Sequence, residues 1–319
     1  MRRTAVLAVT IFLLALVGCS SKDDKADPEG TRVGLGVIPI VDVAPVYLGK
    51  SKGFFSRRGI DLDLVKEQGG PAIVKGVLAG TYEFGFSNVT SLMAAETGDL
   101  PLRAVANGVA STGRPYRDFS AIVVPYGSPI RSPAELAGKR IAVNALKSLG
   151  DTTVRESVRK AGGDPSGIQF EAMPFSAMPG VLQTGKLDGA WIVEPQLTEA
   201  ITLGGQVIAS NFVDTAPDLT VAMYFTANGL IDRDPKLVAK FTDAVKESLA
   251  YAATHPDEVR NAVGTYTQIS DTVRISMALP NWPDEINRPS LERLALLGQR
   301  DGIFPRAPAL DKLLPAAGP

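Results

Sequence analysis

Residues 77–88 (VLAGTYEFGFSN) and residues 181–194 (VLQTGKLDGAWIVE) share one pattern. In both stretches an apolar helix end is followed by a glycine, by an acidic residue three positions later and by a short apolar run. The glycine is suited to ending a helix, and the run has the length of a buried parallel strand. Two such units about a hundred residues apart are too distant for a solenoid repeat and predict two similar α/β lobes. A chance match within an ordinary α/β protein is the alternative at this point.

The segments around these units alternate between strand and helix patterns. Residues 32–40 have the pattern of an apolar strand, and after a helix a second strand pattern covers residues 60–65. Residues 132–143 (SPAELAGKRIAV) repeat this opening with a capping box, a glycine stop and a strand. Residues 219–226 form an apolar strand that can return the chain to the first lobe, and residues 235–254 form the longest amphipathic helix.

The N-terminus has the features of an export signal. Two arginines precede an uncharged run at residues 4–17, which is shorter than the ~20 apolar residues of a membrane-spanning helix. The motif LVGC at residues 16–19 resembles the lipobox of bacterial lipoproteins, which implies cleavage after Gly18 and acylation of Cys19. A signal peptide that happens to contain a cysteine is the alternative. Because Cys19 is the only cysteine, the chain has no partner for an intramolecular disulfide or a cysteine-based zinc site.

The composition excludes a nucleic-acid footprint. The chain has 33 basic and 34 acidic residues, so it has no overall positive charge to neutralise phosphates. No second hydrophobic span or basic amphipathic helix stands out, and we expect membrane contact only through the lipid on Cys19. The length after residue 18 is sufficient for two domains with cores of ordinary size, and we expect a monomer.

The chain as a whole resembles a known family of binding proteins. The resemblance rests on residues 132–143, on APVYL at residues 44–48 with GFF at residues 53–55, on the two repeated units and on Glu194-Pro195. These motifs are similar to those of the extracytoplasmic substrate-binding proteins of ABC importers in the nitrate, sulfonate, taurine and pyrimidine-precursor group. The resemblance implies the type II periplasmic-binding-protein fold, an α/β architecture with two Rossmann-like lobes joined by two crossover strands.

The same resemblance implies what the protein does and where. We expect it to bind a small-molecule ligand between the lobes and to deliver it to an ABC permease and its ATPase, without a cofactor, a metal or catalysis. We expect it to be extracytoplasmic and anchored by lipid to the bacterial cell membrane. The expected segments are a signal peptide (1–18), a lipidated cysteine with a flexible tether (19–31), the first lobe (32–118), the second lobe (119–219) and a return to the first lobe with C-terminal helices (220–319).

Ligands of open α/β sheets bind beyond the carboxyl ends of the strands. The residues that this rule places around one crevice are Asp42, Gln68, Gly69, Ser87, Asn88, Asn144, Ser148, Thr152, Trp191, Glu194 and, on a crossover strand, Tyr224. Our hypothesis is that helix N-termini and hydroxyls hold the polar head of the ligand, while Trp191 and Tyr224 pack against its apolar body.

Several of these residues have a structural alternative. Asp42 is also suited to capping a helix, Glu194 to bracing the hinge, and Trp191 to filling an ordinary core. The sequence also leaves open which residue would balance the charge of an anionic ligand. Arg114 and Arg117 lie near a crossover and are candidates for binding a sulfonate or carboxylate, with surface exposure as the alternative.

Two rival functions remain at this stage. Relatives of this fold that make a thiamine pyrimidine precursor are described as needing an active-site histidine and a cysteine-rich motif. The only histidine here, His255, is better interpreted as the C-terminal cap of a helix. The other rival is a lipoprotein that presents its ligand to a sensor rather than to an importer.

Overall fold

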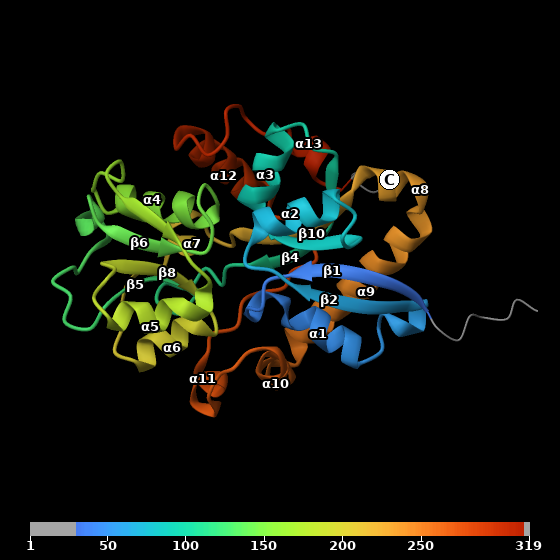
Figure 1. Ribbon diagram of the computed structural model, residues 1–319, viewed down its shortest axis with the longest axis horizontal. Coiled ribbons are helices and arrows are strands. Elements are labelled where there is room, and N and C mark those ends of the chain that lie inside the picture. The colour runs from blue at the N-terminus through green and yellow to red at the C-terminus, as the bar shows by residue number, and fades with distance from the viewer. Residues whose placement is uncertain (1–29, 316–319) are drawn as a thin grey trace, which may run out of the picture.

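The computed structural model describes residues 30–315, which form two lobes, each built on a mixed five-stranded sheet (Figure 1). The predicted signal peptide, Cys19 and the tether up to residue 29 lie outside the described residues. The first sheet has the strand order β2-β1-β3-β10-β4. Its strands are β1 (Thr31–Val37), β2 (Ile60–Lys66), β3 (Phe84–Asn88), β4 (Leu102–Ala110) and β10 (Thr220–Ala227).

The second sheet has the order β7-β6-β8-β5-β9 and repeats the arrangement of the first. Its strands are β5 (Ser120–Val124), β6 (Arg140–Val143), β7 (Gln169–Ala172), β8 (Gly189–Val193) and β9 (Gln206–Ala209). In each sheet four strands run in the same direction, and the fourth strand of the order, β10 or β5, is antiparallel to them. The prediction of an α/β fold with two similar lobes is confirmed.

Two segments carry the chain between the lobes, residues 111–119 after β4 and residues 210–219 after β9. Each links a strand of one sheet to a strand of the other. Tyr224 lies on β10, the strand with which the chain returns to the first sheet as predicted, and is paired with Phe86 of β3 on one side and Ala106 of β4 on the other. The apolar pattern at residues 219–226 is explained by this central position, where both faces of the strand are buried.

The two repeated units have the same structural role in both lobes. Gly80 and Gly185 adopt positive φ angles of 69° and 66° immediately after a helix, as expected for glycines that end helices. The acidic residue then bonds to the neighbouring strand, since Glu83 Oε2 accepts the N–H of Gly34 at 2.7 Å. In the second lobe, Asp188 Oδ2 accepts the N–H of Arg140 at 2.8 Å. The acid therefore aligns two parallel strands in each sheet.

Removing this acid is expected to destabilise the first lobe more than the second. The Glu83 bond is partly buried, whereas the Asp188 bond is exposed and water can replace it. Glu83→Ala should lower the free energy of unfolding by about 1–2 kcal/mol, and Asp188→Ala by about 0.5 kcal/mol. Urea unfolding monitored by circular dichroism measures both values, with the exposed Asp232→Ala as the control. Equal effects would show that burial of the bond does not matter.

Helices cover both faces of each sheet (Figure 1). Those of the first lobe are α1 (Ala44–Ser51), α2 (Gly70–Leu78), α3 (Val89–Thr97), α8 (Asn228–Arg233), α9 (Pro235–Thr254), α10 (Pro256–Tyr266) and α13 (Leu310–Leu313). Those of the second are α4 (Leu149–Lys160), α5 (Met178–Gln183), α6 (Gln196–Thr202) and α7 (Asn211–Thr215). The predicted long helix is α9, whose buried Phe241 stacks on Phe84 of β3 at 3.7 Å.

Two C-terminal helices contact both lobes, α11 (Asp271–Ser276) and α12 (Arg288–Arg300). The sequence predicts these helices as part of the return to the first lobe. In the structure α11 also contacts α6, and α12 lies between α3 and α4, as the red helix near the top of Figure 1 shows. The C-terminal segment thus forms a third connection between the lobes, made by packing and not by the sheet strands.

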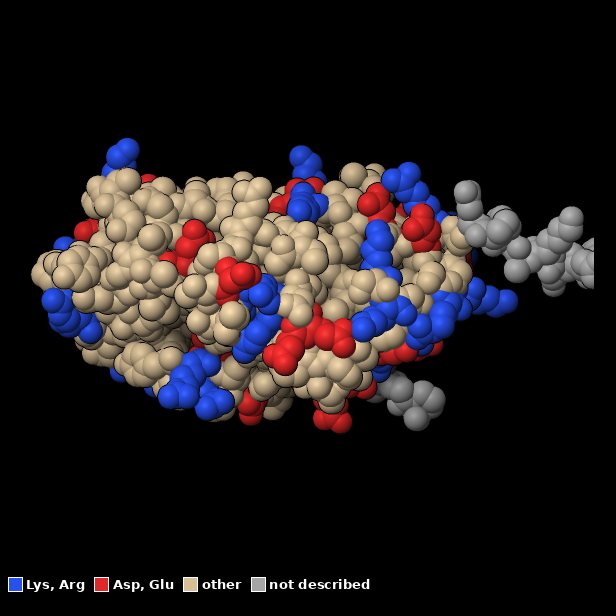
Figure 2. Space-filling view, turned by 90° about the horizontal axis from the view of Figure 1, so that it is seen from below, with Lys and Arg blue, Asp and Glu red and all other residues tan. Residues whose placement is uncertain are grey.

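The surface charges are mixed in sign. Figure 2 shows lysines and arginines interspersed with acidic residues over the face that carries α10 and α11. Over residues 30–315, none of the helices is long and apolar enough to cross a membrane.

Candidate functional site

Polar side chains from both lobes meet where β3 and β6 end. Asn88 is the N-cap of α3, and its Oδ1 accepts the N–H of Ser91 at 2.9 Å. From the second lobe, the Oγ of Ser148 lies 3.0 Å from Ser91 Oγ and 3.3 Å from Asn88 Oδ1. Ser87 is fully buried beside them. The structure therefore brings together three of the predicted site residues, Ser87, Asn88 and Ser148, at the N-termini of two helices that face each other across the lobe boundary.

A second contact across the boundary joins the loops after β2 and β6. Asn144 Nδ2 donates to the backbone carbonyl of Gln68 at 3.5 Å, whereas the side chain of Gln68 is exposed. A Cβ atom at Gly69 would lie 3.1 Å from the same Asn144 nitrogen, which is closer than most side chains tolerate. The glycine allows the backbone to approach the other lobe. Asn144 Oδ1 is buried without a hydrogen-bond partner.

Glu194 ties the end of β8 to the first lobe and to the C-terminal segment. Its backbone carbonyl accepts the N–H of Val41 at 3.0 Å. Its carboxylate accepts bonds from Thr198 at 2.8 and 2.9 Å and from the N–H of Ala278 at 3.0 Å. Burial raises the pKa of this carboxyl to about 7, although these bonds act in the opposite direction. With its oxygens paired inside the protein, Glu194 acts as a brace between the lobes.

Asp42 differs from Glu194 because one of its oxygens is unpaired. The sequence suggested a helix cap, but Asp42 lies inside a short 3-10 helix (Val41–Val43), and α1 receives no side-chain cap. The residue is 3% exposed, and its Oδ1 has no hydrogen-bond partner. Burial and, to a smaller extent, the negative charge of Asp118 raise the pKa of Asp42 to about 7, although a hydrogen bond from its own backbone N–H acts in the opposite direction.

Aromatic residues surround Asp42. The buried hydroxyl of Tyr224 is unpaired, and its pKa is raised by burial and by the charge of Asp42. Tyr47, whose hydroxyl is also unpaired, stacks on Tyr266 at 3.9 Å, and Trp282 Nε1 donates to the backbone carbonyl of Asp42 at 3.3 Å. Sequence reasoning missed three of these residues. Only Tyr47 carried a signal, because it lies five residues after Asp42 in the sequence, whereas Tyr266 and Trp282 belong to the distant C-terminal segment.

Two of the predicted residues make their contacts within the second lobe. Trp191 Nε1 donates to Ser120 Oγ at 2.8 Å, and its ring packs against Phe175 and Phe212 with centroids 5.2 and 6.0 Å apart. The indole therefore belongs to the core of the second lobe. Thr152 is fully buried within α4, and its hydroxyl donates to the carbonyl of Ser148 at 3.3 Å.

The candidate anion-binding arginines are at the surface. Arg114 and Arg117 lie on the crossover after β4, and both are exposed, as is Lys147 in the loop before α4. For Arg117 the structure thus shows the surface exposure that was given as the alternative. Its position follows from the neighbouring Asp118, whose bonds to Ser111 and Thr112 turn the acidic side chain inward and leave the arginine outside.

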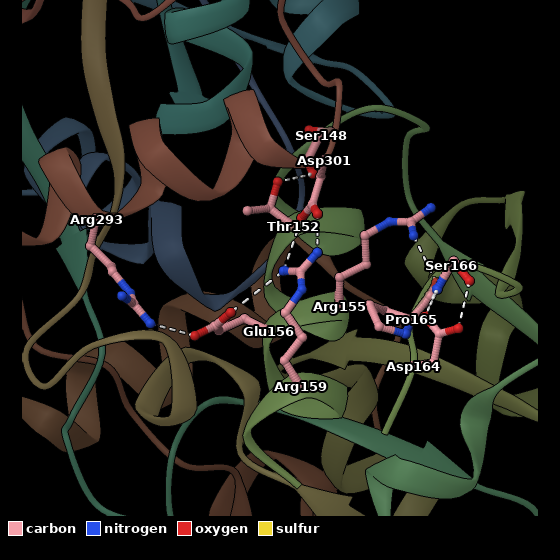
Figure 3. A network of polar contacts seen from close by, with 10 residues as sticks. All are labelled: Ser148, Thr152, Arg155, Glu156, Arg159, Asp164, Pro165, Ser166, Arg293 and Asp301. Atoms are coloured by element: carbon pink, nitrogen blue, oxygen red, sulfur yellow. Dashed lines mark hydrogen bonds and ion pairs between the residues drawn. The ribbon is translucent and has the colours of Figure 1, made fainter. Parts of the chain in front are cut away.

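An ion-pair network joins α4 of the second lobe to α12 and the residue after it (Figure 3). Arg159 forms an ion pair with Asp301, whose side chain is only 3% exposed. Glu156, 8% exposed, pairs with Arg293 at 2.5 Å and with Arg159 at 3.5 Å. Arg159 and Glu156 of α4 thus have partners of opposite charge in the C-terminal segment, Asp301 and Arg293. These ion pairs explain why α12 packs against the second lobe.

The described residues contain no cluster of three or more histidine, cysteine or acidic side chains suited to a metal ion. His255 is the C-cap of α9, where its ring stacks on Tyr251 at 3.8 Å and its Nδ1 lies 2.8 Å from the Tyr251 carbonyl. The arrangement at the lobe boundary is suited to binding a small molecule by hydrogen bonds and aromatic packing.

Comparison with known proteins gives a family match over most of the chain. The family model described as "NMT1/THI5 like" matches residues 40–259. A protein of Brucella abortus is 25% identical over 260 residues, covering 81% of this chain and 76% of its own. The formylaminopyrimidine-binding protein of Halalkalibacterium halodurans is 21% identical, with 83% and 79% covered. An enzyme, the 4-amino-5-hydroxymethyl-2-methylpyrimidine phosphate synthase of Candida albicans, is 23% identical, with 72% and 68% covered.

Solved structures share the fold. The ligand-binding component of an ABC-type import system from Staphylococcus aureus, solved with zinc bound, has a TM-score of 0.76 at 18% identity, covering 89% of this chain and 96% of that one. The periplasmic nitrate-binding protein of Synechocystis PCC 6803 has a TM-score of 0.75 at 15% identity, covering 90% and 86%. At these identities the likeness concerns the fold alone.

Proposed function

From the fact that the chain belongs to the NMT1/THI5-like family, we propose that it is the substrate-binding component of an ABC importer. In this proposal the two lobes close on a small organic solute and present it to a permease and ATPase. The observation that carries the proposal is the contact between Ser91 and Ser148, which brings two helix N-termini from separate lobes together over buried polar groups. Such a boundary between two hinged lobes is suited to enclosing a ligand.

The remaining parts of the proposal follow from the sequence. The protein is extracytoplasmic, is held to the membrane by lipid on Cys19 and is monomeric, with the segment boundaries given above. The proposed ligand contacts include Ser87, Asn88, Asn144 and Ser148 at the lobe boundary. Presentation of the ligand to a sensor uses the same binding step, and a permease gene beside this one would favour import.

The enzyme relative supplies the rival function. The single histidine of the chain is His255, which bonds to the end of its own helix. We therefore propose binding without catalysis. Incubation of the purified protein with candidate pyrimidine precursors, followed by mass spectrometry, would detect a converted product and contradict this.

Closure of the lobes can be tested with a pair of cysteines. In a form that begins at Ser20, the double variant Ser91→Cys and Ser148→Cys has only these two thiols. Because the two oxygens lie 3.0 Å apart, we expect the cysteines to form a disulfide under mild oxidation, and to do so faster with a ligand that closes the lobes. Free-thiol titration and mass spectrometry measure the rate.

The single variants are the controls, since neither can form the intramolecular bond. A ligand at a hundred times its dissociation constant should also add about 2.7 kcal/mol to the free energy of unfolding. If the double variant stays reduced with every compound that raises the unfolding midpoint, the lobes do not close in the way proposed here.

A further inference from the structure

The unpaired buried polar atoms at the lobe boundary are mostly hydrogen-bond acceptors. They include the carboxylate oxygens Asp42 Oδ1 and Asp151 Oδ1 and the amide oxygens Asn144 Oδ1 and Gln196 Oε1. Each belongs to a residue at a strand end or in the first turn of a helix that begins at the boundary. The unpaired hydroxyls of Tyr47 and Tyr224 can donate or accept. The donor-only atom among the unpaired set, Arg155 Nε, belongs to a side chain that stacks on Phe170 of β7 instead.

A buried acceptor is costly unless a ligand, a water molecule or the protein gives it a hydrogen. An oxyanion such as nitrate or a sulfonate has no hydrogen to give, and it would add a negative charge next to carboxylates. A nitrogen group with N–H bonds supplies what these atoms need. The unpaired oxygens therefore favour a ligand with N–H donors over an oxyanion.

The charges near Asp42 favour the same class. Of the described residues, no lysine or arginine forms an ion pair with Asp42, and the charge that acts on it is that of another carboxylate, Asp118. The basic residues closest in sequence to the boundary loops, Arg114, Arg117 and Lys147, are exposed. A cation that reaches Asp42 would balance a buried charge, whereas an anion at Asp42 would add a further negative charge beside Asp118.

The aromatic residues near Asp42 are of the type that packs against flat, cationic groups. Tyr47 and Tyr266 form a stacked pair, and Tyr224 brings its hydroxyl close enough to Asp42 for the acid's charge to raise the tyrosine pKa. Faces of aromatic rings attract cations, and their flat surfaces pack well against planar groups.

We propose that the ligand presents a nitrogen group with N–H donors, such as an amidinium, an ammonium or the amino group of a heterocycle, to Asp42 and Tyr224. We expect no oxyanion at this position. The proposal rests on the proposed function, because it assigns the ligand class of the same site.

Calorimetry with probes of matched shape tests the ligand class. The nitrogen probes are benzamidine and 4-aminopyrimidine, and the oxyanion probes are benzoate, benzenesulfonate and nitrate. We expect the purified protein to bind a nitrogen probe and none of the oxyanions. Asp42→Asn keeps the size of the side chain but removes its charge, and should weaken binding at least about 30-fold, as expected for a buried charged pair. Tyr224→Phe should weaken it about 5-fold.

Two control variants accompany these measurements. Asp232→Asn removes an exposed carboxylate and Arg117→Ala an exposed cation, and both should leave the affinity unchanged. Unfolding midpoints of all variants show whether Asp42→Asn is folded. If it is not, Tyr224→Phe still tests the position. The compound that co-purifies with the protein, released by denaturation and identified by mass spectrometry, gives an independent result.

The outcomes separate the two proposals. A nitrogen ligand that loses affinity in Asp42→Asn supports the assignment. Binding of an oxyanion, or a nitrogen ligand indifferent to both Asp42→Asn and Tyr224→Phe, overturns the assignment and leaves the binding-protein function intact. If no probe binds, no compound co-purifies and the cysteine pair does not close, both proposals are wrong.

Discussion

The affinity for benzamidine is expected to fall about 100-fold when the pH is lowered from 8 to 5. The amidinium stays positive over this range, so the change comes from the protein. Burial raises the pKa of Asp42 to about 7, and the cation binds the ionised carboxylate. Above pH 7 most of Asp42 is ionised and the affinity is constant. Below it, each pH unit removes about nine-tenths of the remaining carboxylate, which costs about 1.4 kcal/mol of binding free energy.

The titration of Asp42 has to be distinguished from that of other groups near it. Asp118, whose pKa burial also raises, faces it from the crossover, and Tyr224 and Tyr266 face it from β10 and α10. The tyrosines stay neutral because their pKa values are raised. Calorimetry of Asp42→Asn should give a weak affinity that does not change with pH, whereas Glu194→Gln should keep the pH dependence. A constant affinity in the unmodified protein would exclude Asp42 from contact with the cation.

The fold was predictable because its determinants are local. A helix end, a glycine and an acid occur within a few residues of each other in both units, and each acid acts on the adjacent strand. The prediction of residues at strand ends had the same basis, which is why Ser87, Asn88 and Ser148 meet at the boundary. A local sequence pattern is sufficient to predict such a contact when the regular geometry of a parallel sheet determines which strand ends lie side by side.

The rest of the site depends on contacts between distant segments. Asp42 has the sequence of a helix cap, and only the positions of Tyr224, Tyr266 and Trp282 show that it is buried instead. Trp191 has the residue type of a ligand-binding aromatic, but the packing of Phe175 against it places it in a core. Neither the burial of Asp42 nor the core position of Trp191 can be predicted from a single sequence. Each depends on which residues of the C-terminal segment or of a neighbouring helix pack against it.

The connection made by the C-terminal segment leads to the largest expected effect on stability. Arg159→Ala should lower the free energy of unfolding by about 3 kcal/mol, measured by urea unfolding at neutral pH. The substitution removes the partner of Asp301, whose side chain is 3% exposed, and leaves that charge buried without compensation. Glu156 loses one of its two arginines at the same time. The effect should therefore exceed that of any surface ion pair in the protein.

Two further variants distinguish a buried charge from lost packing. Arg293→Ala removes an arginine that is 50% exposed, and Glu156 keeps Arg159 as a partner at 3.5 Å, so the change should cost at most about 1 kcal/mol. The double variant Arg159→Met and Asp301→Leu removes both charges and should recover most of the loss, because replacing a buried pair by apolar residues of similar size is often neutral. If the double variant is as unstable as Arg159→Ala, the arginine acts through the packing of its alkyl chain. The C-terminal segment would then be held to the second lobe by shape and not by charge.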